Sequence, residues 1–170
     1  TQATKADDAS GYWNEAMNNI KNQDYRSALI NMTSCIQLSP GVAAAYALRG
    51  WVLLQMESHG SAIDDYTKAI ELNPSEPSSY YYRAIIYYRL SELNRLSDLN
   101  SSMSYLNSAM SDINQCIKLW PYSADAYLIR GLMKSELKDH YGAISDNEKA
   151  IELDPTFSMA YNNMGWAKFN

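Results

Sequence analysis

The sequence lacks the residues on which most enzymes and metal proteins depend. Its 170 residues include only two histidines and two cysteines, and no P-loop, HExxH or GxGxxG motif. The histidines, His59 and His140, lie far apart in the chain, and Cys35 and Cys116 form no CxxC pair. Such scattered residues provide neither a metal cage nor a disulfide framework, and they indicate no cellular compartment. We therefore expect no catalytic residue, no metal and no cofactor.

The sequence also has no long apolar run and no excess of basic residues. Its apolar segments are short, and residues 43–54 are interrupted by Arg49 and Gly50, so no stretch of about 18 apolar residues is available to span a bilayer. Lys and Arg number 14 against 19 Asp and Glu, a net charge of -5. A face that binds nucleic acid would have to form against the electric field of this negative net charge. We expect neither a membrane span nor a nucleic acid partner. The first residue, Thr1, indicates a processed or trimmed chain.

Core-forming residues are plentiful, and prolines mark an internal repeat. Hydrophobic residues make up 46% of the chain, enough for one domain with a sizeable core. Pro40 and Pro74 are 34 residues apart, and so are Pro121 and Pro155, whereas the middle interval is 47 residues. The 13 additional residues indicate one interrupted repeat rather than a lost period.

Each proline follows an amphipathic run whose last residues are similar in all four copies. The runs end in SCIQLSP, KAIELNP, QCIKLWP and KAIELDP, at residues 34–40, 68–74, 115–121 and 149–155. A proline just past the last apolar residue stops a helix, because the residue before it is displaced from the helical region. After each proline a second run places a tyrosine four residues before a small residue: Tyr46/Gly50, Tyr80/Ala84, Tyr127/Gly131 and Tyr161/Gly165, with Tyr12/Ala16 opening the series. Residues four apart share a helix face, so a neighbouring helix can approach at the small residue. Mid-helix glycine at 50, 131 and 165 calls for such a packing reason.

This pattern resembles the tetratricopeptide repeat, a 34-residue helix-turn-helix unit. The resemblance covers residues 9–170 and implies an all-α, right-handed superhelical solenoid of antiparallel helix pairs, with about four repeats plus a terminal helix. We expect a single domain, 1–170, with repeats at about 9–42, 43–76, 77–123, 124–157 and a partial repeat at 158–170. The pattern lacks its usual aromatic at Asn19, Leu53, Lys134 and Asn147, and we expect the second helix of the fourth repeat to pack less tightly.

The 13-residue insertion near residues 91–103 carries a helical stripe. Leucine or methionine recurs every three or four residues from Leu90 to Leu106, and glycine and proline are absent. We expect the first helix to continue to about Leu96 and the second to start early, after a turn at 97–101 capped by Ser97 or Ser101. The alternative is a mobile loop.

Charged and thiol side chains have ordinary structural interpretations. Asp64, Asp65 and Asp146 precede lysines by about one helical turn, a spacing typical of a solvated helix face. Cys35 and Cys116 occupy the place of Ala69 and Ala150 in other repeats, which indicates small buried sites.

The resemblance also implies a concave groove lined by the first helix of each repeat. Carried over position by position, the groove residues are Trp13, Met17, Trp51, Leu54, Tyr81, Ile85, Tyr88, Leu128, Leu132 and Trp166. The alternative is that these side chains only pack between neighbouring first helices. Aromatic residues dominate binding hot spots because they bring a large contact area at a small entropic cost.

Relatives that bind the acidic C-terminus of heat-shock chaperones use a clamp of Lys, Asn and Arg. Here the corresponding positions hold Trp13, Met17, Leu48, Ser78 and Tyr82. The sequence therefore predicts a non-catalytic scaffold that binds an apolar or amphipathic peptide of a protein partner. The alternative is a structural spacer of a longer chain, with contacts through the solenoid ends and the inserted hairpin. The apolar terminal helix, 158–169, predicts self-association through the C-terminal end.

Overall fold

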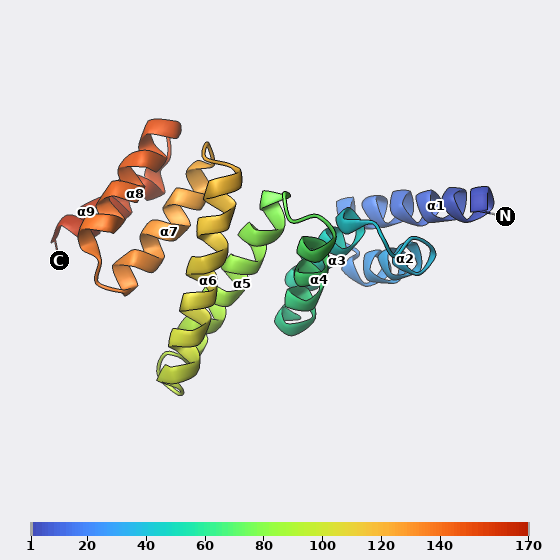
Figure 1. The fold of residues 1–170 in the computed structure, drawn as a ribbon, viewed down its shortest axis with the longest axis horizontal. Coiled ribbons are helices and arrows are strands. Elements are labelled where there is room, and N and C mark those ends of the chain that lie inside the picture. The colour runs from blue at the N-terminus through green and yellow to red at the C-terminus, as the bar shows by residue number, and fades with distance from the viewer. Residues whose placement is uncertain (1, 170) are drawn as a thin grey trace. The chain divides into compact units, whose positions relative to one another are not determined.

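The computed structural model describes the backbone of residues 2–169 and the side chains of residues 8–167. The described residues form nine helices and no strand, which confirms the predicted all-α fold class (Figure 1). The chain divides into two compact units, Thr1–Arg83 and Ala84–Asn170. The predicted organisation as one domain stays a prediction.

The N-terminal unit consists of two helix pairs and the first turns of a further helix. Helix α1 (Gln2–Lys21) packs on α2 (Tyr25–Leu38), and α3 (Ala43–Gln55) packs on α4 (His59–Leu72). Contacts between α2 and α3 join the two pairs. The start of α5 (Pro77–Asn94) completes the unit.

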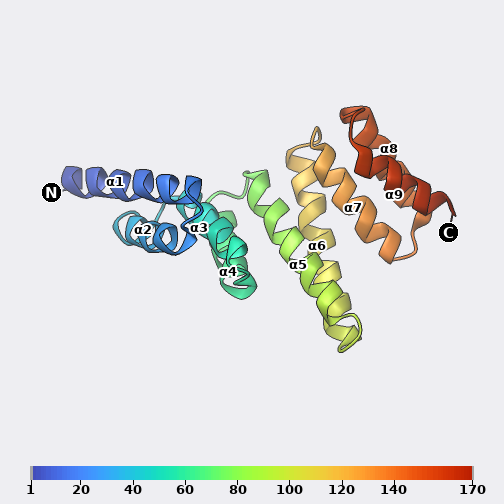
Figure 2. The ribbon, with the colours of Figure 1, turned by 180° about the vertical axis from the view of Figure 1, so that it is seen from behind.

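The C-terminal unit continues the same alternation of helices. It contains the remainder of α5, followed by α6 (Leu99–Leu119), α7 (Ala124–Glu136), α8 (His140–Leu153) and α9 (Ser158–Phe169). Helix α7 packs on α6 and α8, and α9 packs on α8 and α7 (Figure 2). The terminal helix has the bounds that the sequence predicts.

Prolines end the second helix of every pair, as predicted. Helices α2, α4, α6 and α8 each end on a leucine two residues before the proline. The residue between them leaves the helical conformation, but its N–H still donates to the carbonyl four residues earlier, as Ser39 does to Cys35 at 2.9 Å. This hydrogen bond satisfies one of the carbonyls that a helix end would otherwise leave unpaired.

Small residues allow the two helices of a pair to approach closely. Ala28, Ala62, Ala109 and Ala143 are all fully buried. A Cβ atom added to Gly50 would lie 3.2 Å from the ring of Tyr66. The absence of a side chain at Gly50 is therefore what lets the Tyr66 ring lie against α3.

The fourth repeat packs as closely as the second, contrary to the sequence-based expectation. Asn147 takes the place of Tyr66, is fully buried, and donates from Nδ2 to the Ala143 carbonyl at 2.8 Å. A Cβ on Gly131 would lie 2.9 Å from that same nitrogen. The shorter Asn side chain is compensated by closer contact. At Gly165 the expected packing reason is wrong, since no described atom lies within 4 Å of its Cβ position.

The inserted segment extends a helical hairpin, and the mobile-loop alternative is wrong. Helix α5 continues to Asn94 and α6 begins at Leu99, so the turn end of the two helices extends beyond α7 (Figures 1 and 2). The helix cap is Asp98, which accepts from the Ser101 N–H at 3.1 Å, and not Ser97 or Ser101. The Asp98 carboxylate also accepts from the Ser101 hydroxyl at 2.6 Å.

Two aspartates that the sequence assigned to a solvated face are buried. Asp65 is 5% exposed and receives two hydrogen bonds from the Arg49 guanidinium, at 2.7 and 2.8 Å. Asp146 is 3% exposed and receives the same pair from Arg130, together with Lys134 Nζ at 2.9 Å. The interpretation was wrong because each aspartate faces the first helix of its own pair.

Each of these arginines also joins neighbouring repeats. Arg49 donates to the Thr33 hydroxyl at 3.3 Å, and Arg130 donates to Asn114 Oδ1 at 2.9 Å. The aspartate lies 16 residues after the arginine and the second acceptor 16 residues before it. One guanidinium thus fixes the register of three consecutive helices.

We predict opposite effects for alanine at two mid-helix glycines. Gly131→Ala forces Asn147 out of its hydrogen-bonded position and lowers the free energy of unfolding by about 1 kcal/mol or more. Gly165→Ala increases helix propensity without creating a clash. We expect it to raise the free energy of unfolding by about 0.5–1 kcal/mol. Urea unfolding followed by circular dichroism measures both, and shifts in the same direction would contradict the packing described above.

We predict that Asp65→Ala lowers the free energy of unfolding by about 2 kcal/mol, because Arg49 is left half-buried without its carboxylate. Asp64→Ala is the matched control: it removes an exposed carboxylate from the adjacent position of α4 and changes stability little. The comparison is made by urea unfolding in parallel. Equal losses in the two variants would show that the Arg49–Asp65 pair does not stabilise the fold.

Candidate functional site

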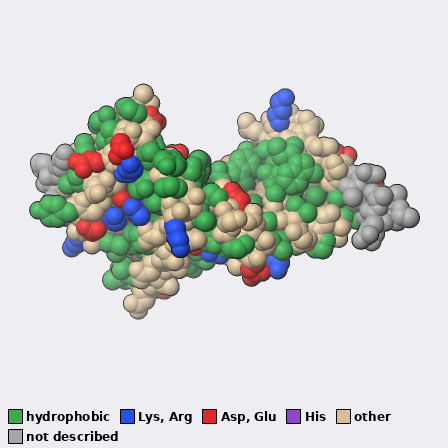
Figure 3. Space-filling model, turned by 45° about the horizontal axis from the view of Figure 1, so that its top comes forward, with side chains coloured by type: hydrophobic (Ala, Val, Ile, Leu, Met, Phe, Trp, Pro, Cys, Tyr) green, Lys and Arg blue, Asp and Glu red, His purple; other side chains and the backbone are tan. Residues whose placement is uncertain are grey.

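The N-terminal unit contains an apolar hollow with a volume of about 530 Å³. Side chains of α1, α3, α4 and the first turns of α5 line it. On the face seen in Figure 3, hydrophobic side chains gather in a broad patch over this unit. We call this hollow the tryptophan hollow, and its lining residues are Trp13, Met17, Ile20, Ala44, Ala47, Leu48, Trp51, Tyr66, Glu76, Ser78 and Tyr82.

Two tryptophans and a methionine project into the tryptophan hollow from successive first helices. Trp13 is half-buried and packs on the core formed by α1, α2 and α3. The half-buried ring of Trp51 meets the ring of Tyr25 edge to face, with 6.0 Å between centroids. Met17, one helical turn after Trp13, is 45% exposed. The two rings are held by the core on one side and present apolar surface on the other.

Tyr66 forms a buried part of the wall and leaves a polar atom unsatisfied. Its side chain is 1% exposed, and the ring stacks on Tyr82 with 5.8 Å between centroids. Its hydroxyl has no hydrogen-bond partner among the described residues. Burial raises the pKa of this hydroxyl well above its usual range, so it remains a neutral donor.

Charge is scarce in the tryptophan hollow. Glu76 is the one charged residue among those that line it, and its carboxylate accepts from the Ser78 N–H at 3.1 and 3.3 Å. Among the residues with described side chains, no lysine or arginine lines the hollow. Its chemistry therefore suits an apolar group and gives no cationic partner for a carboxylate.

The structure brings together some of the predicted groove residues of this unit and not others. Trp13, Met17 and Trp51 line the same hollow. Leu54 is 8% exposed and belongs to the core, although residues three apart share a side of the helix and Leu54 therefore lies on the same side as Trp51. Tyr81 does not line the hollow; its ring meets Tyr82 edge to face at 5.4 Å.

The list of predicted groove residues omits two aromatic residues of the wall, Tyr66 and Tyr82, although Tyr82 appears among the clamp positions. Tyr82 takes the place that Leu48 has in the preceding repeat, and both line the hollow. That shared position was a signal available from the sequence. Tyr66 lies on a second helix, and only the close approach at Gly50 explains why its ring reaches the hollow.

The C-terminal unit has a second hollow, of about 710 Å³, with mixed chemistry. Three predicted residues line it, namely Tyr88, Leu132 and Trp166, and Trp166 is 68% exposed. Charged and polar side chains make up the rest: Arg95, Ser135, Glu136, Lys138, His140 and Asn163.

Glu136 organises the polar side of this second hollow. The Tyr88 hydroxyl donates to its carboxylate at 3.2 Å, and Arg95 Nη1 lies 3.8 Å from the same oxygen. Burial raises the pKa of Glu136, and the hydrogen bond from Tyr88 opposes that shift. The same burial raises the pKa of Tyr88. The hydroxyl therefore stays protonated and donates to the carboxylate.

The other two predicted residues of this unit do not line the second hollow. Leu128 is 3% exposed and packs with Ala150 and Ala160, because α8 and α9 cover it. Ile85 is half-buried on α5 and lines neither hollow.

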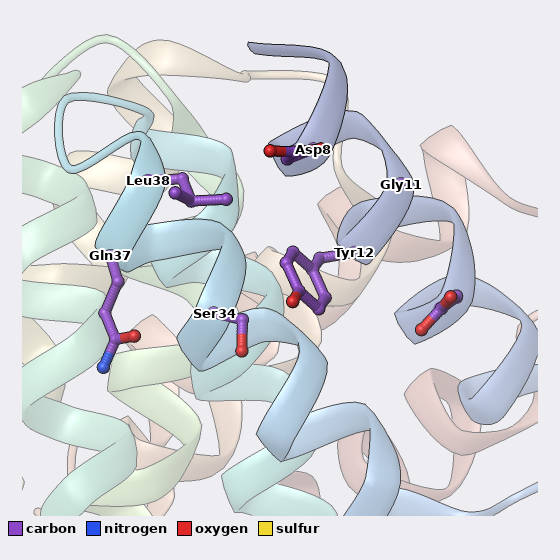
Figure 4. A pocket seen from close by; sticks show the side chains of 7 residues that line it. Asp8, Gly11, Tyr12, Ser34, Gln37 and Leu38 are labelled. Carbon is purple, nitrogen blue, oxygen red and sulfur yellow. The ribbon is translucent and has the colours of Figure 1, made fainter. Parts of the chain in front are cut away.

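A third hollow, of about 540 Å³, lies between α1 and α2 (Figure 4). Asp8, Gly11, Tyr12 and Glu15 line it from α1, and Ser34, Gln37 and Leu38 line it from α2. Figure 4 shows the Tyr12 ring directed toward α2. Its acidic and polar lining differs from that of the predicted groove, which lies on the first helices alone.

The side chains suited to metal binding or catalysis are dispersed. Within residues 8–167 no group of three or more His, Cys, Asp or Glu side chains could hold a metal ion. His59 and His140 begin α4 and α8, in different units. Cys35 and Cys116 are buried, as their small-residue positions predict. None of the described helices combines the length and apolar character needed to cross a membrane.

Comparisons with known proteins agree with this architecture. Sequence models described as "TPR repeat" and "Tetratricopeptide repeat" match residues 50–91 and 124–157. The mouse (Mus musculus) serine/threonine-protein phosphatase 5 is 30% identical over 112 residues, which are 66% of this chain and 20% of the phosphatase. The chain thus spans about a fifth of the length of the curated relatives it matches.

Solved structures show the same fold. MamA superposes with a TM-score of 0.80 at 21% identity, over 96% of this chain and 82% of MamA. The first TPR of Spaghetti (RPAP3), bound to the HSP90 peptide SRMEEVD, has a TM-score of 0.65 at 25% identity, over 75% of this chain and 90% of that one. These likenesses show the fold; together with the helix pairs and the proline-ended second helices, the two sequence-model matches show that the chain is a tetratricopeptide repeat protein.

Proposed function

We propose that the chain is a non-catalytic scaffold that binds an apolar or amphipathic peptide segment of a protein partner in the tryptophan hollow. The observation that carries this proposal is the placement of Trp13, Met17 and Trp51 around one hollow. Half-buried tryptophans that are fixed by a core bind at a small entropic cost, since their side chains are already ordered. A volume of about 530 Å³ accommodates one or two large side chains of a peptide.

The chemistry of the hollow argues against an acidic peptide. The RPAP3 structure holds the HSP90 peptide SRMEEVD, whose sequence is rich in carboxylates. Here Glu76 is the one charge among the lining residues, and it would repel a second carboxylate. An apolar segment followed by a basic residue fits better, because its cation would lie near Glu76.

The second hollow extends the proposal to the C-terminal unit. Tyr88, Leu132 and Trp166 offer apolar contacts there, while Arg95 and Lys138 supply positive charge. We propose that it contacts a second, more polar part of the partner. Tyr81 and Ile85 flank the proposed binding residues, whereas Leu54 and Leu128 support them from the core.

We predict that Trp51→Ala weakens peptide binding about 30-fold, because loss of a central aromatic hot spot costs about 2 kcal/mol. The ligand is a peptide selected on the intact chain from a random display library and measured by isothermal titration calorimetry. Trp120→Ala is the matched control: Trp120 is 50% exposed at the end of α6 and lines none of the three hollows.

A second variant shows whether weaker binding results from a changed binding site or from loss of the fold. Met17→Glu places a charge at a site that is 45% exposed, so the fold is retained while an apolar ligand is repelled. Equal affinity of wild type, Trp51→Ala and Met17→Glu for the selected peptide would refute the proposed site.

Exposed apolar side chains at the inserted hairpin and the terminal helix favour the alternative function, a structural spacer. Leu93, Leu96 and Leu99 at the turn end of α5 and α6 are 69%, 97% and 64% exposed. Met159 and Tyr161 on the terminal helix are also exposed, and Phe169, the last residue of that helix, lies outside the described side chains. Exposed apolar clusters of this kind mark contact surfaces.

We predict that these exposed apolar surfaces make the chain self-associate. Light scattering at several concentrations compares wild type with Leu96→Ser, which changes the hairpin, and Trp166→Ser, which changes the terminal helix. A particle mass that rises with concentration and falls in one variant assigns the contact to that surface. A monomer at every concentration in all three proteins contradicts self-association.

A further inference from the structure

We propose that the Tyr66 hydroxyl is a specificity-determining donor of the tryptophan hollow, which binds a backbone or amide carbonyl beside the apolar side chain of the ligand. The inference rests on the proposed function and names the chemistry of the ligand at that same site. The occupant is therefore a peptide segment and not an apolar surface alone.

The first support is the unsatisfied state of this hydroxyl. Tyr66 is 1% exposed, and its oxygen has no partner among the described residues. A buried hydroxyl without a hydrogen bond is costly, and native proteins pair nearly all such groups. Phenylalanine would fill the same space without that cost. The retained oxygen therefore indicates a partner that arrives from outside the chain.

The second support is the position of the ring. Tyr66 lines the hollow together with Trp13, Trp51 and Tyr82. The ring is held against Gly50, with ring carbons 3.2–3.3 Å from the position of an added Cβ, so it cannot turn toward α3 to find a partner. The stacked ring of Tyr82, half-buried, covers it on another side. A ligand that displaces the Tyr82 ring reaches the hydroxyl.

The kind of partner follows from the protonation state. Because burial raises the pKa of Tyr66, the hydroxyl keeps its proton and donates. Its partner is an acceptor, and the nearby Glu76 disfavours a carboxylate acceptor. A neutral carbonyl, of which a peptide carries one at each residue, meets both conditions.

The fourth repeat supplies a structural comparison. Asn147 occupies the corresponding position, and its Nδ2 donates to the Ala143 carbonyl within its own helix. Asn147 does not line the second hollow. The donor at this position is therefore paired in the fourth repeat, where only the acceptor Oδ1 of Asn147 lacks a partner among the described residues, and it is unpaired in the second repeat, where Tyr66 lines the tryptophan hollow.

The test uses two probes that share an indole ring. N-acetyl-L-tryptophanamide carries amide carbonyls, whereas 3-methylindole carries none. The full chain is labelled with ¹³C at the methionine methyl groups, and titration of the Met17 signal gives the dissociation constant of each probe. Met17→Leu assigns that signal. The proteins compared are wild type, Tyr66→Phe and, as control, Tyr80→Phe, whose hydroxyl bonds to the Pro74 carbonyl away from the hollow.

We expect the preference for N-acetyl-L-tryptophanamide over 3-methylindole to fall about fivefold to tenfold in Tyr66→Phe and to stay unchanged in Tyr80→Phe. We also expect Tyr66→Phe without ligand to unfold at the same urea concentration as wild type or at a higher one. This combination distinguishes a binding hydroxyl from a structural one, since loss of a structural hydrogen bond lowers stability.

Three outcomes would overturn the inference. An unchanged preference in Tyr66→Phe, with both probes still bound at Met17, refutes the role of the hydroxyl and leaves the proposed function standing. A lower unfolding midpoint in Tyr66→Phe shows that the hydroxyl already has a partner in the free chain. If neither probe shifts the Met17 signal of wild type, the proposed function and the inference fail together.

Discussion

The close approach of paired helices at small residues is the constraint on which the rest of the structure depends. Ala28, Ala62, Ala109 and Ala143 have no exposed surface, and at Gly50 and Gly131 even a methyl group would crowd the partner helix. A helix pair of this kind buries little apolar surface by itself. Its remaining apolar face is covered by the next pair, which is the reason that such repeats are stable only as an array.

This constraint also decides where the large side chains lie. Small residues such as Gly50 lie where paired helices meet, and Trp51, the next residue, lies about 100° further round the helix. Trp13 and Trp51 then need only partial cover from their neighbours, and their outer surfaces form the wall of a hollow. The arginine–aspartate pairs fix the register of neighbouring helices. Arg49 donates hydrogen bonds to Asp65 within its own repeat and to Thr33 in the preceding repeat.

Stability and binding are in conflict at Tyr66. Its ring fills the space that Gly50 leaves, and this packing stabilises the helix pair. Its hydroxyl is buried without a partner, which lowers stability by an amount that phenylalanine would restore. Sites at which a protein retains a locally unfavourable group are commonly functional sites. The tryptophan hollow fits that description, because its one deeply buried polar group faces a space suited to a peptide.

Sequence patterns were sufficient to predict the fold because each local signal, such as a proline after a helix, recurs in several repeats. The proline after Leu38 recurs after three further leucines, and the leucine stripe of the insertion predicts the extended hairpin that α5 and α6 form. The side of a helix on which a charge lies was harder to predict. Asp65 has a lysine one turn away, as a solvated residue would, and only its 16-residue spacing from Arg49, repeated at Arg130 and Asp146, indicates burial.

The site was less predictable than the fold, since its wall includes residues outside the first-helix positions. The groove pattern finds Trp13, Met17 and Trp51 but names Tyr81 where the structure places Tyr82. It also places Leu54 and Leu128 in a groove, although neighbouring helices cover them. How far a neighbouring helix covers a side chain depends on packing between repeats, and a single repeat pattern does not contain that information.

The most direct test of the central claim is a crystal structure of the chain with a peptide selected for binding to it. The account predicts an apolar side chain of that peptide between Trp13 and Trp51, in contact with Met17. It would be contradicted by a peptide bound elsewhere, for example on the exposed leucines at the turn of α5 and α6, with the tryptophan hollow unoccupied.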